Sequence, residues 1–202
     1  MSAERCLMCQ RAGEAKRVCR VRDVETREAF LIAECPSCGV MRTLPVPPSL
    51  AAHYDSVLGR VMKARAGGIH TVLQRVLLKR ELRRIVSRRA PLRMVDVGCG
   101  SGEFAAVIHQ QGFAVATADA DARRPYWTSD ISAIPHYQFD YDTYDIQGHP
   151  PLDGSTMIFR HVIEHVKDPS RLLARMIEYG ASAFYLVVPN AACLERRLLG
   201  TS

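Results

Sequence analysis

Val95-Asp96-Val97-Gly98-Cys99-Gly100-Ser101-Gly102-Glu103-Phe104 joins an apolar run to a helical pattern through three glycines at alternate positions. The apolar run, residues 92–97, predicts a buried strand, and residues 104–108 predict the inward face of a helix. Glycine lets a backbone turn tightly and lie against a ligand without an intervening Cβ. The unpaired N–H groups at a helix start favour a carboxylate or phosphate. Together these features predict a site for a nucleotide-type cofactor.

The glycine spacing distinguishes this loop from two other nucleotide-binding motifs. The dinucleotide motif, Gly-x-Gly-x-x-Gly, would need its third glycine at Glu103. The phosphate-binding P-loop would need a following Gly-Lys-Ser/Thr, which this chain lacks. The spacing therefore argues against an NAD-linked oxidoreductase and against a P-loop enzyme.

The spacing Gly98-x-Gly100-x-Gly102, with Asp96 two residues before the first glycine, resembles motif I of class I S-adenosylmethionine-dependent methyltransferases. The resemblance implies that the loop, including Cys99 and Ser101, passes under the methionine part of the cofactor. It also implies that Asp96 helps to hold the methionine amino group, directly or through water.

Two further strand ends lie where this family places acidic residues. Residues 113–118 are apolar and are followed by Asp119 and Ala120. A carboxylate there can accept two hydrogen bonds from a ribose diol. The resemblance implies ribose binding by Asp119, with Asp121 as a second choice; the alternative is a simple turn and helix cap. Phe139 and Asp140 are candidates for the adenine ring and its amino group, or else belong to a polar loop.

A further apolar strand, residues 156–159, is followed by Arg160-His161-Val162-Ile163-Glu164-His165, which also resembles the family. Ligands of open α/β sheets bind at the carboxyl ends of strands, which predicts that Arg160 and His161 lie near cofactor and acceptor. An imidazole can accept a proton near neutral pH, so we expect His161 first and His165 second as general base. Glu164 would orient either ring. The alternative is that Glu164 and His165 only brace a helix turn.

Strands that alternate with helices predict an α/β fold with a doubly wound, mostly parallel, Rossmann-like sheet. The chain also has a capped helix start at Asp168-Pro169 and a strand over residues 183–188. The family's sheet normally ends in an antiparallel hairpin, and no counterpart precedes Ser202. We therefore expect the sheet to lack its last two strands. The uncovered edge would favour self-association, so a homo-oligomer is one expectation.

Four cysteines near the N-terminus form two matching pairs, Cys6-x2-Cys9 and Cys35-x2-Cys38. Each pair places two thiolates on one side of a tight turn, and two such turns complete a tetrahedral site for Zn²⁺. Strand-like runs over residues 17–24, 29–34 and 39–44 complete the layout of a zinc ribbon. Four thiolate ligands close the coordination shell, so the zinc is expected to be structural. A ribbon without metal or a redox pair is the alternative.

The zinc ribbon strengthens the family resemblance, because some bacterial sugar and small-metabolite methyltransferases carry such a module before the cofactor domain. The expected domains are a ribbon over residues 1–45, a linker and helical segment over 46–90, and the S-adenosylmethionine-binding domain over 91–202. Prolines at positions 45, 47 and 48 mark the first boundary.

The chain has 202 residues and a net charge of +6. No apolar run is long enough for a membrane span. Seven cysteines without a secretory signal predict a reducing, cytoplasmic setting. Residues 69–89 hold seven basic residues against the single acid Glu81, and this difference of six equals the net charge of the chain. A long helix is predicted there, with one face packed on the domain by apolar residues at helical spacing: Ile69, Val72, Leu73, Val76, Leu77, Ile85 and Val86.

The basic residues of that helix are either a solvated face or a surface for an anionic partner. No nucleic-acid-binding signature accompanies them. Two functions remain: a methyltransferase acting on a small-molecule acceptor such as a sugar, or a non-catalytic scaffold that docks a partner through the ribbon and the basic helix. The sequence does not identify the methyl acceptor.

Overall fold

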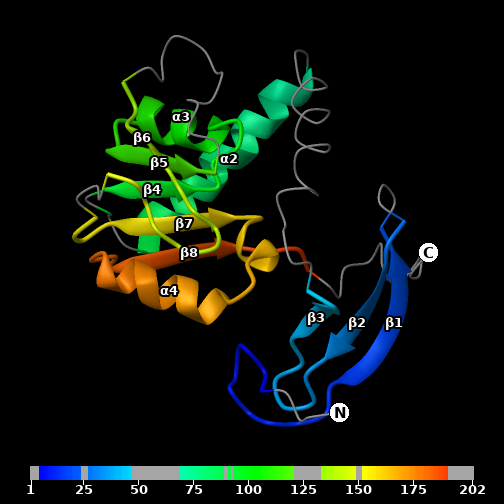
Figure 1. Cartoon of the computed structure of the whole chain (residues 1–202). Coiled ribbons are helices and arrows are strands. Elements are labelled where there is room, and N and C mark those ends of the chain that lie inside the picture. The colour runs from blue at the N-terminus through cyan, green and yellow to red at the C-terminus, as the bar shows by residue number, and fades with distance from the viewer. Residues whose placement is uncertain are drawn as a thin grey trace.

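The computed structural model describes residues 5–23, 27–46, 69–88, 91, 93–120, 133–148 and 152–190. Within these residues the strands form two separate sheets, one of three and one of five strands (Figure 1). The small sheet belongs to the N-terminal cysteine region, and the large sheet carries the glycine loop.

The three-stranded sheet is antiparallel in the order β1 (Lys16–Arg22), β2 (Ala29–Glu34) and β3 (Met41–Leu44). The predicted strand runs are confirmed, with ends that differ by at most two residues. The register of β1 against β2 shifts between Arg17 and Cys19, where β1 carries a bulge. A bulge inserts one extra residue and changes which side chains share a face of the sheet.

The five-stranded sheet has the order β6-β5-β4-β7-β8, and every neighbouring pair is parallel. Its strands are β4 (Met94–Val97), β5 (Val115–Asp119), β6 (His136–Gln138), β7 (Thr156–Arg160) and β8 (Ala183–Val187). The chain runs outward from β4 in both directions, which is the doubly wound arrangement predicted from the sequence. Residues 191–202 lie outside the described residues, so the expected lack of two last strands stays a prediction.

Helices cover both faces of the parallel sheet (Figure 1). The helices α2 (Ile69–Arg88) and α3 (Glu103–Gln110) pack on one face, where Met94 and Ile158 point toward them. The helix α4 (Pro169–Glu178) packs on the other face, against Val95 and Phe159. Alternate strand residues therefore serve two cores, as in other sheets that are buried on both sides.

The start of α4 agrees with the prediction from Asp168-Pro169. The Asp168 side chain accepts a 3.0 Å hydrogen bond from the Arg171 backbone N–H, and Pro169 occupies the first turn. This cap satisfies one of the N–H groups that a helix start leaves unpaired. The backbone N–H of Asp168 in turn donates to the Tyr144 hydroxyl at 3.0 Å, which fixes α4 to the loop after β6.

The helix α2 forms where it was predicted, but it packs differently from the prediction. Four of the apolar residues expected on its packed face are more than half exposed: Val72, Leu73, Val76 and Leu77. The buried side is made by Leu78 and Leu82, which were not expected there, and by Ile85, which was. These residues lie at i, i+4 and i+7, and at 100° per residue they lie on roughly the opposite side of the helix from the exposed set. The sequence predicted a single apolar stripe on α2, whereas the structure has two, one exposed and one buried.

Candidate functional site

The segments that were singled out for cofactor binding meet at the carboxyl edge of the parallel sheet. The glycine loop follows β4, Asp119 ends β5, Phe139 follows β6 and His161 follows β7. Hydrogen bonds join them: the backbone N–H of Gly100 donates to Asp119 Oδ2 at 2.8 Å, and that of Phe139 donates to the Asp119 carbonyl at 2.8 Å. In doubly wound sheets this edge is where ligands bind.

Gly98 is where the loop packs tightly against its surroundings. Its φ is +66°, a left-handed conformation that glycine adopts without strain. A Cβ on Gly98 would lie 2.4 Å from Val162 Cγ2 and 2.9 Å from Tyr141 Oη. The glycine is therefore needed for the loop to pass between the segments that follow β6 and β7.

Gly100 differs from Gly98 because it faces open space. Its φ is +51°, and a Cβ placed on it would meet no described atom within 4 Å. Gly102, which precedes α3, is also left-handed and provides no side chain to cap the helix. The loop backbone here carries no side chains and lies beside an open space and the start of a helix. Such a backbone suits a ligand that lies against the loop. The loop therefore suits the methionine part of S-adenosylmethionine, which is the role that its resemblance to motif I implies; this role stays a prediction.

Asp96 lies under the loop and is only 3% exposed. Its burial raises the pKa of the carboxyl from 3.8 to about 7, although the nearby Arg160 guanidinium opposes this rise. The negative charges of Asp119 and Glu81 add to the rise. A carboxyl that titrates near neutrality could ionise to hold an ammonium group, as the motif I resemblance implies for Asp96.

Arg160 connects the carboxyl edge to the helical layer. Its Nε donates to Glu81 Oε1 on α2 at 3.0 Å, and its guanidinium lies 4.7 Å from the centre of the Phe104 ring on α3. Sequence reasoning did not assign a role to Glu81. The available signal was that Glu81 is the sole acid in an otherwise basic helix. Its ion pair fixes Arg160 beside Asp96.

The two residues proposed for adenine have other partners in this structure. Phe139 is 1% exposed and packs edge-on against Tyr141, with ring centres 4.7 Å apart. Asp140 Oδ1 accepts backbone hydrogen bonds from Asp142 at 2.8 Å and Thr143 at 3.2 Å, which lower the pKa of Asp140. These contacts agree with the polar-loop alternative. The adenine roles of Phe139 and Asp140 stay predictions.

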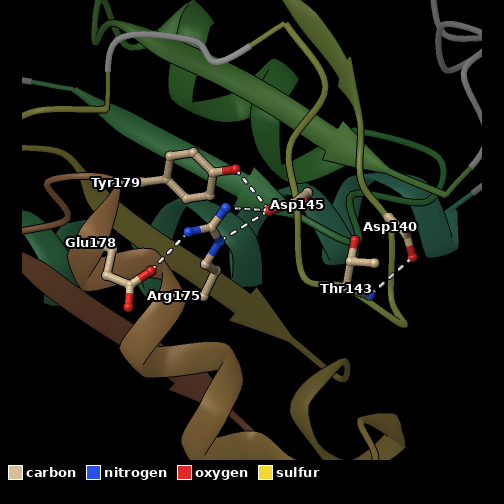
Figure 2. Close-up of polar contacts among 6 residues, drawn as sticks. All are labelled: Asp140, Thr143, Asp145, Arg175, Glu178 and Tyr179. Atoms are coloured by element: carbon tan, nitrogen blue, oxygen red, sulfur yellow. Dashed lines mark hydrogen bonds and ion pairs between the residues drawn. The ribbon is translucent and has the colours of Figure 1, made fainter.

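A second acid of the same loop fixes it to α4 (Figure 2). Asp145 Oδ1 accepts hydrogen bonds from Arg175 Nη2 at 2.7 Å and from the Tyr179 hydroxyl at 3.0 Å. Arg175 also bonds Glu178 at 2.8 Å. The loop after β6 is thus braced at two of its three acids, Asp140 within its own turn and Asp145 against the helix.

Both histidines proposed as bases lie beside one carboxylate. Glu164 Oε1 is 3.5 Å from His161 Nδ1 and 3.9 Å from His165 Nε2. The two imidazoles are about half exposed, at 57% and 49%, whereas Glu164 is 22% exposed. His161 has a φ of +56°, an uncommon conformation for a residue with a side chain. This arrangement fits a carboxylate that orients an imidazole, and it also fits a simple brace of the 3-10 turn η2 (Ile163–His165).

Cys99 and Ser101 contribute to the shape of the glycine loop more than to its chemistry. Cys99 is half-buried, and desolvation raises the pKa of its thiol, so the thiol stays protonated at neutral pH. Ser101 and Ala120 lie at the same edge, Ser101 half-buried and Ala120 exposed. Asp121, the second choice for ribose binding, lies outside the described residues.

The four cysteines of the N-terminal module converge. The sulfur atoms of Cys6, Cys9, Cys35 and Cys38 all lie within 4.8 Å of one another. The Cys6–Cys38 and Cys9–Cys35 sulfur distances are both 3.8 Å. A tetrahedral site with zinc–sulfur bonds of about 2.3 Å has sulfur–sulfur edges of about 3.8 Å. The geometry therefore fits a Zn²⁺ ion.

The two cysteine turns have the same backbone design. In each, the residue after the second cysteine is left-handed: Gln10 with φ +59° and Gly39 with φ +72°. Each of these residues donates its N–H to the carbonyl of the first cysteine, at 2.8 Å and 2.9 Å. Backbone N–H groups of Ser37 and Cys38 donate to the Cys35 sulfur and lower the pKa of that thiol to about 6, whereas burial and the three neighbouring thiols raise the pKa of Cys38. Such donors favour the thiolate that a metal requires.

The chain was compared with known proteins. No curated protein sequence matches it. Among solved structures, it resembles the crystal structure of a SAM dependent methyltransferase from Archaeoglobus fulgidus, with 20% sequence identity and a TM-score of 0.43; the match covers 65% of this chain and 63% of that chain. A family model described as a methyltransferase domain matches residues 71–201. That range holds more than half of the chain, including the glycine loop and every strand of the parallel sheet, and the chain therefore belongs to the methyltransferase domain family.

Proposed function

We propose that the chain is an S-adenosylmethionine-dependent methyltransferase that acts on a small-molecule acceptor such as a sugar. One observation carries this proposal. The open Gly100 of the glycine loop lies next to the Asp119 carboxylate, and the backbone N–H of Gly100 holds that carboxylate in place by a hydrogen bond. The membership of the methyltransferase domain family supports it. The match covers 63% of the similar structure, so part of that structure's length has no counterpart in this chain.

The cofactor roles follow from the positions of the residues. The bound cofactor would supply a methyl group on a sulfonium, which is an activated leaving group. The loop of residues 98–102 would lie against the methionine part, and Asp96 would face its ammonium. Asp119 uses Oδ2 for the loop, and its Oδ1 has no hydrogen bond to a described residue, so Oδ1 is the atom we assign to the ribose. Arg160 would keep Asp96 ionised when the cofactor is bound.

The acceptor roles belong to the segment after β7. The proton that the acceptor loses would pass to an imidazole nitrogen of His161, or of His165 as the second choice. Glu164 would orient the ring and stabilise the resulting imidazolium. Alignment of donor and acceptor and exclusion of water would supply most of the remaining acceleration.

The zinc in this proposal is structural. Four cysteine thiolates leave no coordination position for a substrate, and a small ribbon gains folding free energy from the metal. The first cysteine turn also contacts the methyltransferase part, because the Ser170 hydroxyl at the start of α4 donates to the Leu7 carbonyl at 2.8 Å. The ribbon would therefore support the position of α4.

Turnover tests the proposal. Purified chain is incubated with S-adenosylmethionine and a panel of sugars and other small metabolites, and formation of S-adenosylhomocysteine is followed. We expect acceptor-dependent turnover that falls at least tenfold in His161→Asn, with unchanged cofactor affinity. Glu164→Gln should lower kcat and move its pH profile, which a purely structural brace would not do. Cofactor binding without turnover on any acceptor would favour a scaffold, for which the exposed face of α2 is the specific support.

A further inference from the structure

The outward face of α2 exposes aliphatic side chains in its first half. Val72 is 66% exposed, Leu73 58%, Val76 56% and Leu77 55%. They occupy two successive turns, so they form one continuous patch, here called the aliphatic patch. In Figure 1 this half of α2 extends beyond the edge of the parallel sheet. The sheet therefore does not cover the patch.

The same outward face is cationic in its second half. The exposed basic residues there are Lys79, Arg80, Arg83, Arg84 and Arg88, here called the basic patch. None of them forms an ion pair with another residue of the described ranges. The sole acid of α2, Glu81, is bonded to Arg160 instead. At 100° per residue, Val76 and Arg80 both point away from the buried side, so the two patches are contiguous.

The combination of patches restricts the partner. Cations alone would suit any polyanion, including a nucleic acid, but the aliphatic patch gains nothing from phosphates. Proteins that bind single-stranded nucleic acids add aromatic rings on which bases stack, and α2 contains no Phe, Tyr or Trp. An anionic bilayer offers both features, because acidic headgroups lie directly above an apolar layer.

We propose that the outward face of α2 binds the surface of an anionic phospholipid membrane. The aliphatic patch enters the boundary between headgroups and acyl chains, and the basic patch pairs with lipid phosphates. A protruding helix suits such a surface because a membrane needs no groove. No helix among the described residues is long and apolar enough to cross a membrane. The proposed contact is with the membrane surface.

Membrane contact would bring the candidate site close to the bilayer. The Gln74 side chain in the first half of α2 donates a hydrogen bond to Glu103, the first residue of α3. Glu103 directly follows the glycine loop, so the aliphatic patch and the loop lie at the same edge of the sheet. Docking through the first half of α2 would therefore bring the end of the molecule that carries the loop toward the lipid surface.

The ribbon offers a matched control for non-specific charge attraction. Strand β1 exposes three arginines, Arg17, Arg20 and Arg22. Their register partners are every second residue of β2, namely Ala33, Leu31 and Ala29. The bulge between Arg17 and Cys19 thus places all three arginines on one face of the ribbon sheet. A triple Arg→Gln change there removes the same charge as a triple change in the basic patch.

The test is co-sedimentation of the full chain with vesicles of phosphatidylcholine alone or with one quarter phosphatidylglycerol, at about 0.1 M salt. We expect binding to the anionic vesicles and little to the neutral ones. R80Q/R83Q/R84Q should weaken the partition coefficient by about a hundredfold, since each interfacial cation contributes about fivefold. V72S/L73S/V76S should weaken it at least tenfold at unchanged charge. R17Q/R20Q/R22Q should change it by less than threefold.

Three results would overturn the proposal. The first is that the full chain does not bind anionic vesicles. The second is an equal loss in the α2 and ribbon charge variants, which would indicate general charge attraction. The third is that polyuridylate outcompetes vesicles and binds V72S/L73S/V76S as tightly as wild type. That result would indicate that the partner is a nucleic acid. Thermal melts confirm that each variant folds; if a triple variant melts early, the single changes Arg83→Gln and Val76→Ser are measured against Arg20→Gln.

Discussion

The side-chain carboxylate of Asp119 accepts a 2.8 Å hydrogen bond from the backbone N–H of Gly100. This bond links the end of β5 to the loop after β4, two neighbouring strands of the parallel sheet. One oxygen of Asp119 thus holds the loop in shape, while the rest of the carboxylate is directed to a ligand in our proposal. Loop shape and ligand contact therefore depend on the same residue.

Substitutions at Asp119 should separate these two roles. Asp119→Asn can keep an oxygen acceptor for the Gly100 N–H but loses the charge, so we expect cofactor affinity to fall about tenfold with little change in stability. Asp119→Ala should lose both and lower the free energy of unfolding by about 1–2 kcal/mol. Calorimetric titration with S-adenosylhomocysteine and urea denaturation measure the two effects. Equal affinity of Asp119→Asn and wild type would remove Asp119 from the ligand site.

Gly98→Ala should destabilise the fold strongly. The added Cβ would lie 2.4 Å from Val162 Cγ2, and the φ of +66° is unfavourable for alanine. The backbone strain alone costs about 1–2 kcal/mol, and the overlap adds to it. Gly112→Ala is the control, because Gly112 has a φ of +81° with no described atom within 4 Å of its Cβ position. Thermal melts should place Gly98→Ala well below the control; the same melting temperature for both would contradict the close packing at Gly98.

Asp96 should make stability depend on pH. Its pKa is about 7 in the fold against 3.8 as the ordinary value, so between these pH values the folded chain keeps a proton that the unfolded chain has lost. The stability of the cofactor-free chain therefore falls as the pH rises from about 4 to about 7, by up to about 4 kcal/mol from this group. Asp96→Asn should remove that part of the slope. Urea denaturation of both proteins from pH 4.5 to 8 gives the comparison, and parallel curves would show that Asp96 is ionised throughout.

The cysteine cluster should hold one zinc ion per chain. Cys9→Ser should lose the tightly held metal and unfold the ribbon, since zinc binding supplies the folding free energy of such modules. Cys19→Ser is the matched control, because Cys19 lies on β1 outside the cluster. Atomic absorption after dialysis measures the metal content. Wild type without zinc, or an equal loss in both variants, would contradict a zinc site.

The sequence predicted much of the framework because local patterns determine it. Glycine spacing, apolar runs of strand length and paired cysteines are short-range signals, and the strands, the Asp168 cap and the convergence of four cysteines agree with them. The packing of α2 was predicted wrongly in its first half, because Val72 and Leu78 are both apolar and only the tertiary fold decides which side meets the sheet; Ile85 is buried as expected. The ion pair of Glu81 with Arg160 joins residues 79 positions apart.

Two further features depend on details that no pattern carries. Phe139 and Asp140 follow a strand as expected, yet burial of the ring and a turn closed by the carboxylate decide their contacts. The shared face of Arg17 and Arg20 depends on a bulge, because strict alternation would place residues three apart on opposite faces. A short-range turn therefore decides the contacts of Asp140, and a one-residue shift decides the shared face of the arginines.

The most direct test of cofactor binding is a calorimetric titration of S-adenosylmethionine or S-adenosylhomocysteine into three proteins: wild type, Gly100→Arg and Gly112→Arg. Both glycines are left-handed with open surroundings, so the two variants carry similar strain and differ in place alone. We predict one cofactor bound per chain in wild type and Gly112→Arg, and at least a hundredfold weaker binding in Gly100→Arg. No binding to wild type, or undiminished binding to Gly100→Arg, would contradict a cofactor site at the glycine loop.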